Sequence, residues 1–370
     1  MTNRSVATQQ VISAQRYRAA QPRIQYRRQS GLALIMVLLI FAVVSVLAVH
    51  IIDRQSVNIQ RSATMFTLQQ SRAYTYAAEQ AVRAGLYLDW NANKEKDHAN
   101  EEWTKPRTFP LEPGKIYIKI SDAQGRFNLN SLSAAAANKT EQTQRFSNLL
   151  KLLGLDVQLA TATAKWMDKE SQVDDIYESL EPPYRAAYQG CKHVSELLLV
   201  EGVDMEAYQA LLPYISCLPA TAQLNVNTAS AVVLASLDSG LTLQDGQSLV
   251  SARGDDGFSS VDDFWNQSIL ERYTQPQSNN NNSGASGATN GGGNNNQPKW
   301  QKGDFSILSE YFEMFARVDL NERYATSEAL IRRDKADARM TTLYRDYSRR
   351  EEKPGPVVPG TELAAQATSN

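Results

Sequence analysis

Residues 31–52 read GLALIMVLLIFAVVSVLAVHII, and Asp53 ends this apolar run. No side chain within it carries a formal charge when His50 is neutral. At about 1.5 Å of rise per residue, the run forms a helix of roughly 30 Å, which matches the hydrocarbon core of a bilayer. The stretch therefore predicts one membrane-spanning helix, and the organisation of the chain follows from it.

The residues that precede this run are basic. Residues 1–31 contain six arginines and no Lys, Asp or Glu. Basic residues that flank an apolar helix stay in the cytoplasm. We therefore expect a single-pass membrane protein with a cytoplasmic N-terminus and, after Ile52, a domain outside the cytoplasm; in a Gram-negative cell this means the inner membrane and the periplasm.

Three interpretations of the segment compete. The first is a plain signal anchor. The second is a cleaved secretory signal, but the apolar run is too long for one, and Val46, Leu47 and Ala48 offer only a weak cleavage site. The third interpretation rests on RRQSG at 27–31, which places basic residues and a glycine directly before the run. A protease at the cytoplasmic face would then remove the leader and keep the helix.

This third pattern resembles the class III leaders of type IV pilins and type II secretion pseudopilins, which prepilin peptidase cuts after a glycine. The resemblance implies cleavage between Gly31 and Leu32, with methylation of the new N-terminus. Met36 then becomes the fifth mature residue, where most of these proteins carry Glu. This difference points to the K-type minor pseudopilins and makes Met36 a determinant of position in the fibre.

The pattern after the membrane run stays helical as far as Trp90, with Ala73, Ala77, Ala81 and Gly85 recurring every four residues. Residues 91–114 are rich in Asn, Lys and Pro and indicate a loop. Residues 115–121 alternate apolar and polar side chains, and residues 126–132 follow a Gln-Gly turn, so we expect a β-hairpin.

The remaining chain separates into a helical block and a group of strands. Residues 133–272 contain helical patterns, residues 273–302 are dominated by Asn and Gly, and strand patterns return at 307–320, 324–332 and 340–347. The order predicts an α+β pseudopilin fold, in which a long N-terminal helix packs on a small antiparallel sheet and a large, mostly helical domain is inserted. The expected domains are a cleaved leader at 1–31, a transmembrane segment at 32–52, a periplasmic helix at 53–90, an α+β domain at 91–132 and 303–350, an inserted helical domain at 133–272, a disordered loop at 273–302 and a disordered tail at 351–370.

An acidic stretch lies inside the helical block. Its four carboxylates, Asp168, Glu170, Asp174 and Asp175, fall within eight residues. Composition alone favours a solvated loop over a Ca²⁺ site. The resemblance favours calcium, because the family holds this ion in a W-x-D-x-D…E-D-x-Y run that Asp168, Asp174, Asp175 and Tyr177 match. Glu170 stands where the family has Asp. We therefore expect calcium as a structural cofactor.

Two cysteines, Cys191 and Cys217, lie 26 residues apart. In an oxidising periplasm a disulfide between them would stabilise the fold by about 3–4 kcal/mol. Two buried thiols are the alternative.

Residues 224–234 and 256–264 are similar to a helix-hairpin-helix DNA-binding motif. The hairpin at 238–246 contains two Asp and no Lys or Arg, whereas phosphate binding needs basic residues nearby. The net charge of −2, which becomes −8 without the leader arginines, also argues against nucleic acid. We interpret the segment as one that packs against protein. No phosphate-binding loop, Rossmann or Gly-x-Ser-x-Gly pattern occurs, so we expect no enzymatic activity and no catalytic residue.

The resemblance implies a minor pseudopilin at the tip of the type II secretion pseudopilus, which caps the fibre and initiates its assembly for the export of folded proteins. The implied partners are the I- and J-type minor pseudopilins, prepilin peptidase, the inner-membrane secretion platform and either the secretin or an exoprotein. Two alternatives remain: an uncleaved, membrane-anchored periplasmic binding protein, and a helix-hairpin-helix DNA-uptake module.

Overall fold

The computed structural model describes residues 30–112, 114–136, 138–275, 300–320, 323–348 and 350–357. The predicted leader up to residue 29, most of the predicted Asn/Gly-rich loop and the end of the predicted tail lie outside these residues. The chain divides into two units, residues 1–65 and 66–370, and each is described by itself.

The described part of the first unit is a single helix. α1 runs over Ser30–Ala92, so its part from Phe66 onward belongs to the second unit. The side chains of its apolar first part are exposed, and within the described residues α1 is the one helix long and apolar enough to span a membrane. The long helix predicted as far as Trp90 is confirmed to within two residues.

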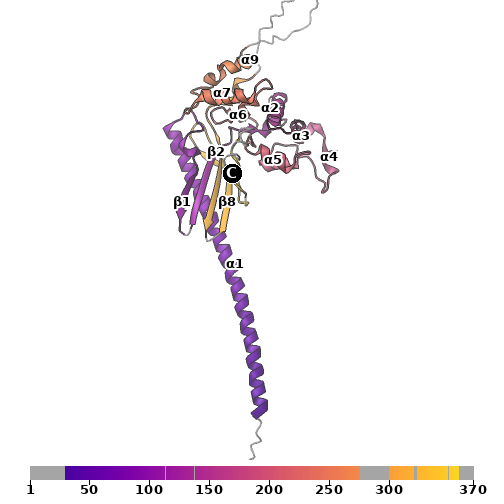
Figure 1. Ribbon diagram of the computed structural model, residues 1–370, viewed down its shortest axis with the longest axis vertical. Coiled ribbons are helices and arrows are strands. Elements are labelled where there is room, and N and C mark those ends of the chain that lie inside the picture. The colour runs from indigo at the N-terminus through magenta and orange to yellow at the C-terminus, as the bar shows by residue number, and fades with distance from the viewer. Residues whose placement is uncertain are drawn as a thin grey trace, which may run out of the picture. The chain divides into compact units, whose positions relative to one another are not determined.

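The second unit contains a five-stranded antiparallel sheet in the order β1-β2-β7-β8-β9 (Figure 1). Its strands are β1 (Arg107–Leu111), β2 (Gly114–Asp122), β7 (Tyr311–Leu320), β8 (Arg323–Arg333) and β9 (Met340–Asp346). One stripe of α1, formed by Ala78, Val82 and Leu86, packs on the sheet residues Ile116, Ile118, Phe312, Met314, Ala316, Val318, Ala329 and Ile331. The three strands predicted after residue 306 are confirmed.

The predicted hairpin is wrong. β2 pairs with β1, from the region assigned to a loop, whereas β3 (Phe127–Asn128) pairs in parallel with β4 (Ile215–Ser216). β1 contains Pro110, and most of its side chains are exposed, both of which an edge strand tolerates. For this reason its sequence shows no alternation of apolar and polar residues that would predict a strand. The turn at Gly125 instead packs against Thr228: a Cβ added to Gly125 would lie 2.7 Å from the Thr228 hydroxyl oxygen. The chain leaves the sheet at this turn.

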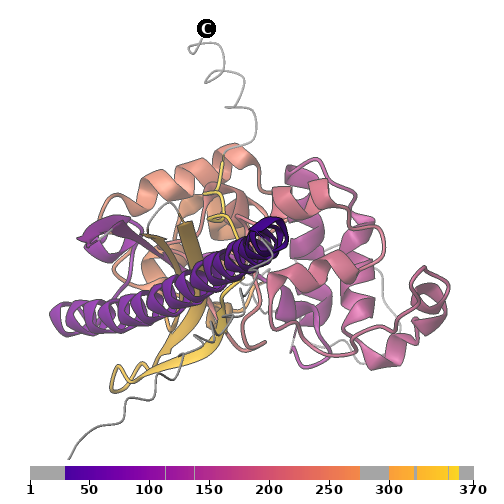
Figure 2. The same cartoon turned by 90° about the horizontal axis from the view of Figure 1, so that it is seen from below.

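The helices between β2 and β7 form one hydrophobic core that extends from Phe127 to Phe305. Figures 1 and 2 show α2–α5 on one side and α6, α7 and α9 on the other. The helical elements are η2 (Leu129–Leu132), α2 (Lys139–Leu152), α3 (Gln158–Trp166), η3 (Lys169–Ser171), α4 (Asp174–Glu178), η4 (Val194–Leu199), α5 (Met205–Leu211), α6 (Ala231–Ala235), α7 (Leu243–Arg253), α8 (Val261–Trp265), η5 (Ser268–Leu270), α9 (Glu271–Thr274) and η6 (Lys302–Asp304). Two short strands, β5 (Leu224–Asn225) and β6 (Phe305–Ser306), pair in parallel beside them.

Residues 351–357 correct the prediction of a disordered tail. Lys353 pairs with Glu313 of β7 and donates to Glu328 of β8 at 2.8 Å, and the Val357 amide donates to the Tyr214 hydroxyl at 3.0 Å. Lys353 and Arg126 hold the pKa of Glu313 below its usual range, although burial opposes them. The sequence predicted no order here because the segment has few apolar residues. Ion pairs, and not hydrophobic burial, hold it against the rest of the chain.

Candidate functional sites

The predicted cleavage position lies at the start of α1. Gly31 has no heavy atom within 4 Å of the position where a Cβ would stand, and the side chains of Leu32 and Met36 are 61% and 59% exposed. No described residue outside the helix therefore shields this end of α1. The leader itself lies outside the described residues.

The acidic stretch forms a loop and two short helices. Asp168 is the N-cap of η3, where its side chain accepts from the Glu170 amide, and it pairs with Lys139 of α2. The hydrogen bond from Lys139 and that from the Glu170 amide lower the pKa of Asp168. Asp174 begins α4 and accepts from the Ala186 amide at 3.2 Å.

An aromatic cluster fixes the position of this loop. The rings of Trp166 and Tyr177 meet edge to face at 4.7 Å between centroids, and Tyr184 packs on both. The Tyr188 amide donates to the Trp166 carbonyl at 2.9 Å, which ties the two ends of the loop together. The family motif's Tyr177 is thus a buried support for the loop.

The four predicted ligands do not converge within the described residues. Among the residues that the structure describes, the one group of three carboxylates whose oxygens all lie within 4.8 Å is Asp89, Asp97 and Glu101, far away in the sequence. The acidic loop offers the oxygen donors that calcium prefers, but Lys139 neutralises the first of them. As it stands, the loop is held by an ion pair and backbone hydrogen bonds.

Cys191 and Cys217 form a disulfide, with their Cα atoms 5.7 Å apart. Asn130 of η2 lies beside it and binds both chain segments that the bridge connects. Its side chain donates to the carbonyls of Cys191 and Leu218 at 2.8 Å and accepts from the Cys191 amide at 2.6 Å. The sequence gives no local signal for the role of Asn130, because its partners follow more than 60 residues later.

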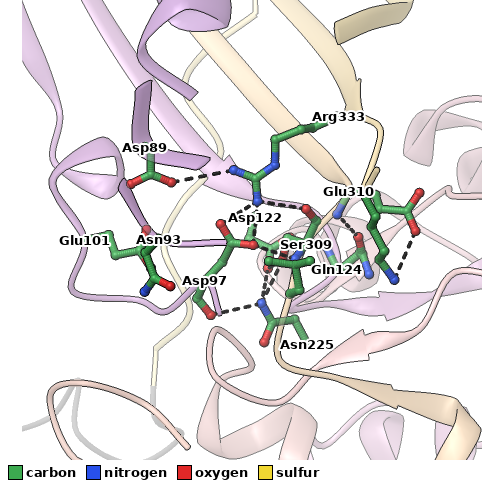
Figure 3. A network of polar contacts seen from close by, with 12 residues as sticks. Asp89, Asn93, Asp97, Glu101, Asp122, Gln124, Asn225, Ser309, Glu310 and Arg333 are labelled. Atoms are coloured by element: carbon green, nitrogen blue, oxygen red, sulfur yellow. Dashed lines mark hydrogen bonds and ion pairs between the residues drawn. The ribbon is translucent and has the colours of Figure 1, made fainter. Parts of the chain in front are cut away.

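A buried polar network, which sequence analysis missed, joins the sheet to the helical part (Figure 3). Arg333, 1% exposed at the end of β8, donates to both carboxylate oxygens of Asp97 at 2.6 Å. Asp97 accepts from the Ser309 amide at 2.7 Å, and the Ser309 hydroxyl donates to Asp122 at 2.5 Å. Asn225 of β5 donates to the Ser309 hydroxyl and to Asp122, at 2.7 and 3.2 Å. Burial raises the pKa of Asp122 to about 6 despite these hydrogen bonds.

Asp89 extends this network to α1. One of its oxygens lies 3.6 Å from Arg333, and the carboxyl of Glu101 is close enough to share a proton with it. Burial, followed by the negative charges of Glu101 and Asp97, raises the pKa of Asp89 to about 7. Asp89 and Asp97 thus share one guanidinium, which binds the end of α1 to the loop after it.

Ser195 and His193 lie side by side at the start of η4, with the Ser195 hydroxyl oxygen 2.8 Å from Nδ1 of His193. The His193 ring nitrogen accepts from the Ser195 amide at 3.1 Å, and Glu196 closes a capping box at the start of η4. The imidazole therefore serves as a helix cap here.

Comparison with known proteins places these features in a family. The family model described as type II secretion system, protein K, matches residues 125–220, and a second model with the same description matches residues 224–283. Type II secretion system protein K of Pseudomonas aeruginosa is 32% identical over 340 residues, which cover 86% of this chain and 93% of that protein. The chain belongs to the type II secretion system protein K family.

Other members of the protein K family agree. The Klebsiella pneumoniae protein is 35% identical, with 66% of this chain and 81% of that protein covered. Among solved structures, a chain of the GspK-GspI-GspJ complex from enterotoxigenic Escherichia coli matches with a TM-score of 0.64 and 25% identity, covering 78% of this chain and all of that one.

As a member of the protein K family, the chain is a minor pseudopilin of the type II secretion system, and its apolar helix makes it a membrane-anchored protein. Its mixed helix and sheet architecture, with a long N-terminal helix and an antiparallel sheet, agrees with the solved relative. These findings do not favour an uncleaved binding protein or a DNA-uptake module.

Proposed function

We propose that this minor pseudopilin occupies the tip of the pseudopilus, where it caps the fibre and initiates its assembly. Met36 carries the proposal. In pilin-like fibres the carboxylate at this position pairs with the N-terminal amine of the neighbour above, and the thioether of Met36 cannot form that ion pair. A subunit without the carboxylate is tolerated best where no neighbour lies above it.

The topology supports the same position. The described residues between the end of β2 at Asp122 and the start of β7 at Tyr311 are mostly helical, and we interpret the block predicted at 133–272 as a helical domain inserted into the pseudopilin fold. A block of this size would obstruct a subunit stacked directly above it in a helical shaft. It would also offer a surface to the secretin or to an exoprotein.

The partners follow from this position. A relative is found in a GspK-GspI-GspJ complex, so we infer I- and J-type minor pseudopilins as the neighbours of this chain. We further infer that prepilin peptidase cuts between Gly31 and Leu32 at the inner membrane, with the leader in the cytoplasm and the rest of the chain in the periplasm. The secretion platform of the inner membrane would then extract the mature helix.

Immunogold labelling of pseudopili tests the tip position. An epitope tag at the C-terminus of this chain should place gold at one end of each fibre, whereas the same tag on the main shaft subunit should place gold along its length. Label from this chain at regular intervals along the shaft would contradict the proposal.

We also propose that the acidic loop binds calcium. The supports are its four carboxylates and the aromatic cluster that holds the loop in place. Calcium would supply the positive charge that now comes from Lys139, so the two compete for Asp168.

Terbium luminescence tests this site, because Trp166 is packed against the loop and can sensitise a bound lanthanide. Terbium emission should be displaced by Ca²⁺, should weaken in Asp174→Asn and Asp175→Asn, and should strengthen in Lys139→Met. Asp337→Asn, at an exposed carboxylate elsewhere, is the matched control. Equal emission from all four variants would exclude the site.

A further inference from the structure

Two buried acids lie on the face of the sheet that points away from α1. Phe312 and Met314 of β7 pack with α1, so Glu313 between them points to the other face, and the register places Glu328 of β8 on that face as well. The side chains of Glu313 and Glu328 are only 10% and 6% exposed. We call this surface the outer face; it is formed by Lys119, Ser121, Glu313, Phe315 and Glu328.

Arg126 compensates one of these two acids. Its guanidinium lies 2.7 Å from Glu313. Glu328 accepts from the Tyr344 hydroxyl at 3.0 Å, which brings no charge, and the His193 ring nitrogen is 3.5 Å away, beyond the usual length of a hydrogen bond. A buried carboxylate is costly unless a cation compensates it, so the pair needs a second positive charge.

Lys353 supplies this charge from the C-terminal segment 351–357. Its ammonium group pairs with Glu313 and donates to Glu328 at 2.8 Å, so it bridges two neighbouring strands. Burial would raise the pKa of Glu313, but the charge of Lys353 and then that of Arg126 outweigh burial and hold this pKa below its usual range. The two acids therefore form a site that selects a lysine.

The neighbouring residues of the segment follow the same surface. Glu352 pairs with Lys119 of β2 at 2.6 Å, so an acid and a base that are adjacent in the chain both meet opposite charges on the outer face. Residues 354–356 line a cavity of about 100 Å³ together with the outer face. Two of these three are prolines, which restrict the backbone, so less conformational freedom is lost when the segment binds.

The end of the segment is fastened to the helical block at 133–272. The Val357 amide donates to the Tyr214 hydroxyl at 3.0 Å, and this hydroxyl donates to the Val357 carbonyl. Tyr214 is buried and directly precedes β4. The segment therefore runs from the sheet to the helical block and connects them at a place other than the buried network around Arg333.

This attachment is of a kind that opens locally. Most residues of the segment are exposed, and Val357 is 42% exposed. No backbone–backbone hydrogen bond joins residues 351–357 to another described residue. Segments with few buried apolar contacts and few backbone hydrogen bonds open without global unfolding. The segment can therefore detach while the sheet and the helical block stay folded.

We propose that residues 351–357 are a releasable latch, whose Lys353 occupies a lysine-binding site formed by Glu313 and Glu328. The occupant of the site is the chain's own C-terminal segment. With the latch closed, the helical block is fastened to the sheet at Tyr214 as well as at the Arg333 network. With the latch open, the network remains and the block gains freedom to move relative to the sheet. This inference does not depend on the tip position.

Peptide binding in trans tests the site. The chain is truncated after Arg350 and kept in detergent micelles, and the probe is a fluorescent peptide of residues 351–357 with blocked ends. Fluorescence anisotropy should show saturable binding to the truncated chain. Binding to the full chain should be at least about tenfold weaker, because its own latch fills the site at a high effective concentration. A chain that ends at Pro359 keeps the latch, so it is the matched control and should behave like the full chain.

A peptide with Met in place of Lys353 tests the recognition of lysine. It has a similar length without the charge, so it should bind the truncated chain about tenfold more weakly than the native peptide. Equal binding of the two peptides would overturn the proposal. So would the absence of native-peptide binding to a truncated chain that circular dichroism shows to be folded.

Lys353→Met in the full chain keeps the test decisive if the truncated chain does not fold. This variant should bind the native peptide, because its own latch is weakened. Lys335→Met, at a more exposed lysine that pairs with Glu310, is the matched control and should bind no more than wild type. Equal binding by the two variants would overturn the proposal.

Hydrogen exchange of the same Lys353→Met chain follows the release itself. Exchange should become faster at the Val357 amide and in β4, and should stay unchanged at the Ser309 amide of the Arg333 network. A wild-type rate at Val357 would show that Lys353 does not hold the latch. An equal rise at Ser309 would show that the segment is a fixed part of the fold. Either result would overturn the proposal.

Discussion

At the scale of single residues, Arg333 matters most for the link between sheet and helices. Its guanidinium is buried against Asp97 and stacks over the Phe312 ring at 4.6 Å. Asp97 and Arg333 lie 236 residues apart, and each looks like an ordinary surface residue in its local sequence. No periodic pattern could have paired them, because only the tertiary fold brings their backbones together.

Replacing Arg333 with Met should lower the free energy of unfolding by about 3–5 kcal/mol, since it leaves the buried carboxylate of Asp97 without its cation. Urea unfolding of the detergent-solubilised chain measures the change. Arg332→Met, at the neighbouring and more exposed arginine, should cost less than about 1 kcal/mol. Equal losses in the two variants would contradict the assigned role.

Asp89 makes stability depend on pH. Its pKa of about 7 in the folded chain lies above the ordinary value of 3.8. Between about pH 4 and 7 the folded state therefore holds a proton that the unfolded chain has released, and the free energy of unfolding falls as pH rises. Asp89→Asn carries no such proton, so its stability relative to wild type should increase over the same window by about 1–2 kcal/mol.

Urea unfolding at pH 5, 6, 7 and 8 measures this difference. The acidic groups near Asp89 are Glu101 and Asp97, and Arg333 opposes them. A difference between variant and wild type that stays constant with pH would show that Asp89 does not titrate in this range.

At the scale of elements, those with strong local signals were predicted well. α7 lies in the block predicted to be helical at 133–272, and a capping box between Thr242 and Asp245 fixes its start. β1 was missed because an edge strand with Pro110 has no alternating pattern to detect. The disulfide could be proposed from two cysteines, but the approach of their Cα atoms depends on η2 and β4, which lie far apart in the sequence.

The packing of α1 on the sheet should depend on its inward stripe. Leu86 is fully buried there, so Leu86→Ala should lower the free energy of unfolding by about 2–5 kcal/mol. Leu88→Ala, two residues along on the exposed side, is the matched control and should change little. Similar losses in both would mean that the buried stripe has been misassigned.

The disulfide links Cys191 and Cys217, which are 26 residues apart in the sequence. Replacing both cysteines with Ser should lower the free energy of unfolding by about 3–4 kcal/mol, mainly through the greater freedom of the unfolded chain. Reducing agent should then destabilise wild type and leave the double variant unchanged. A wild type insensitive to reduction would contradict a stabilising bridge.

At the scale of the whole molecule, the order of patterns along the chain predicted the architecture better than it predicted any site. A long helix, strands, helices and strands again indicated a sheet built from distant segments, and β2 and β7 are such neighbours. The acidic loop was visible as a run of carboxylates, yet its pairing with Lys139 was not.

The central claim is that the chain loses its basic leader and keeps the apolar helix that follows. N-terminal sequencing and intact mass of the protein extracted from membranes test this directly. The mature chain should begin at methylated Leu32, and a Gly31→Val variant should retain its leader and fail to support secretion. A wild-type chain that begins at any other residue, or that keeps its leader arginines while secretion proceeds, would contradict it.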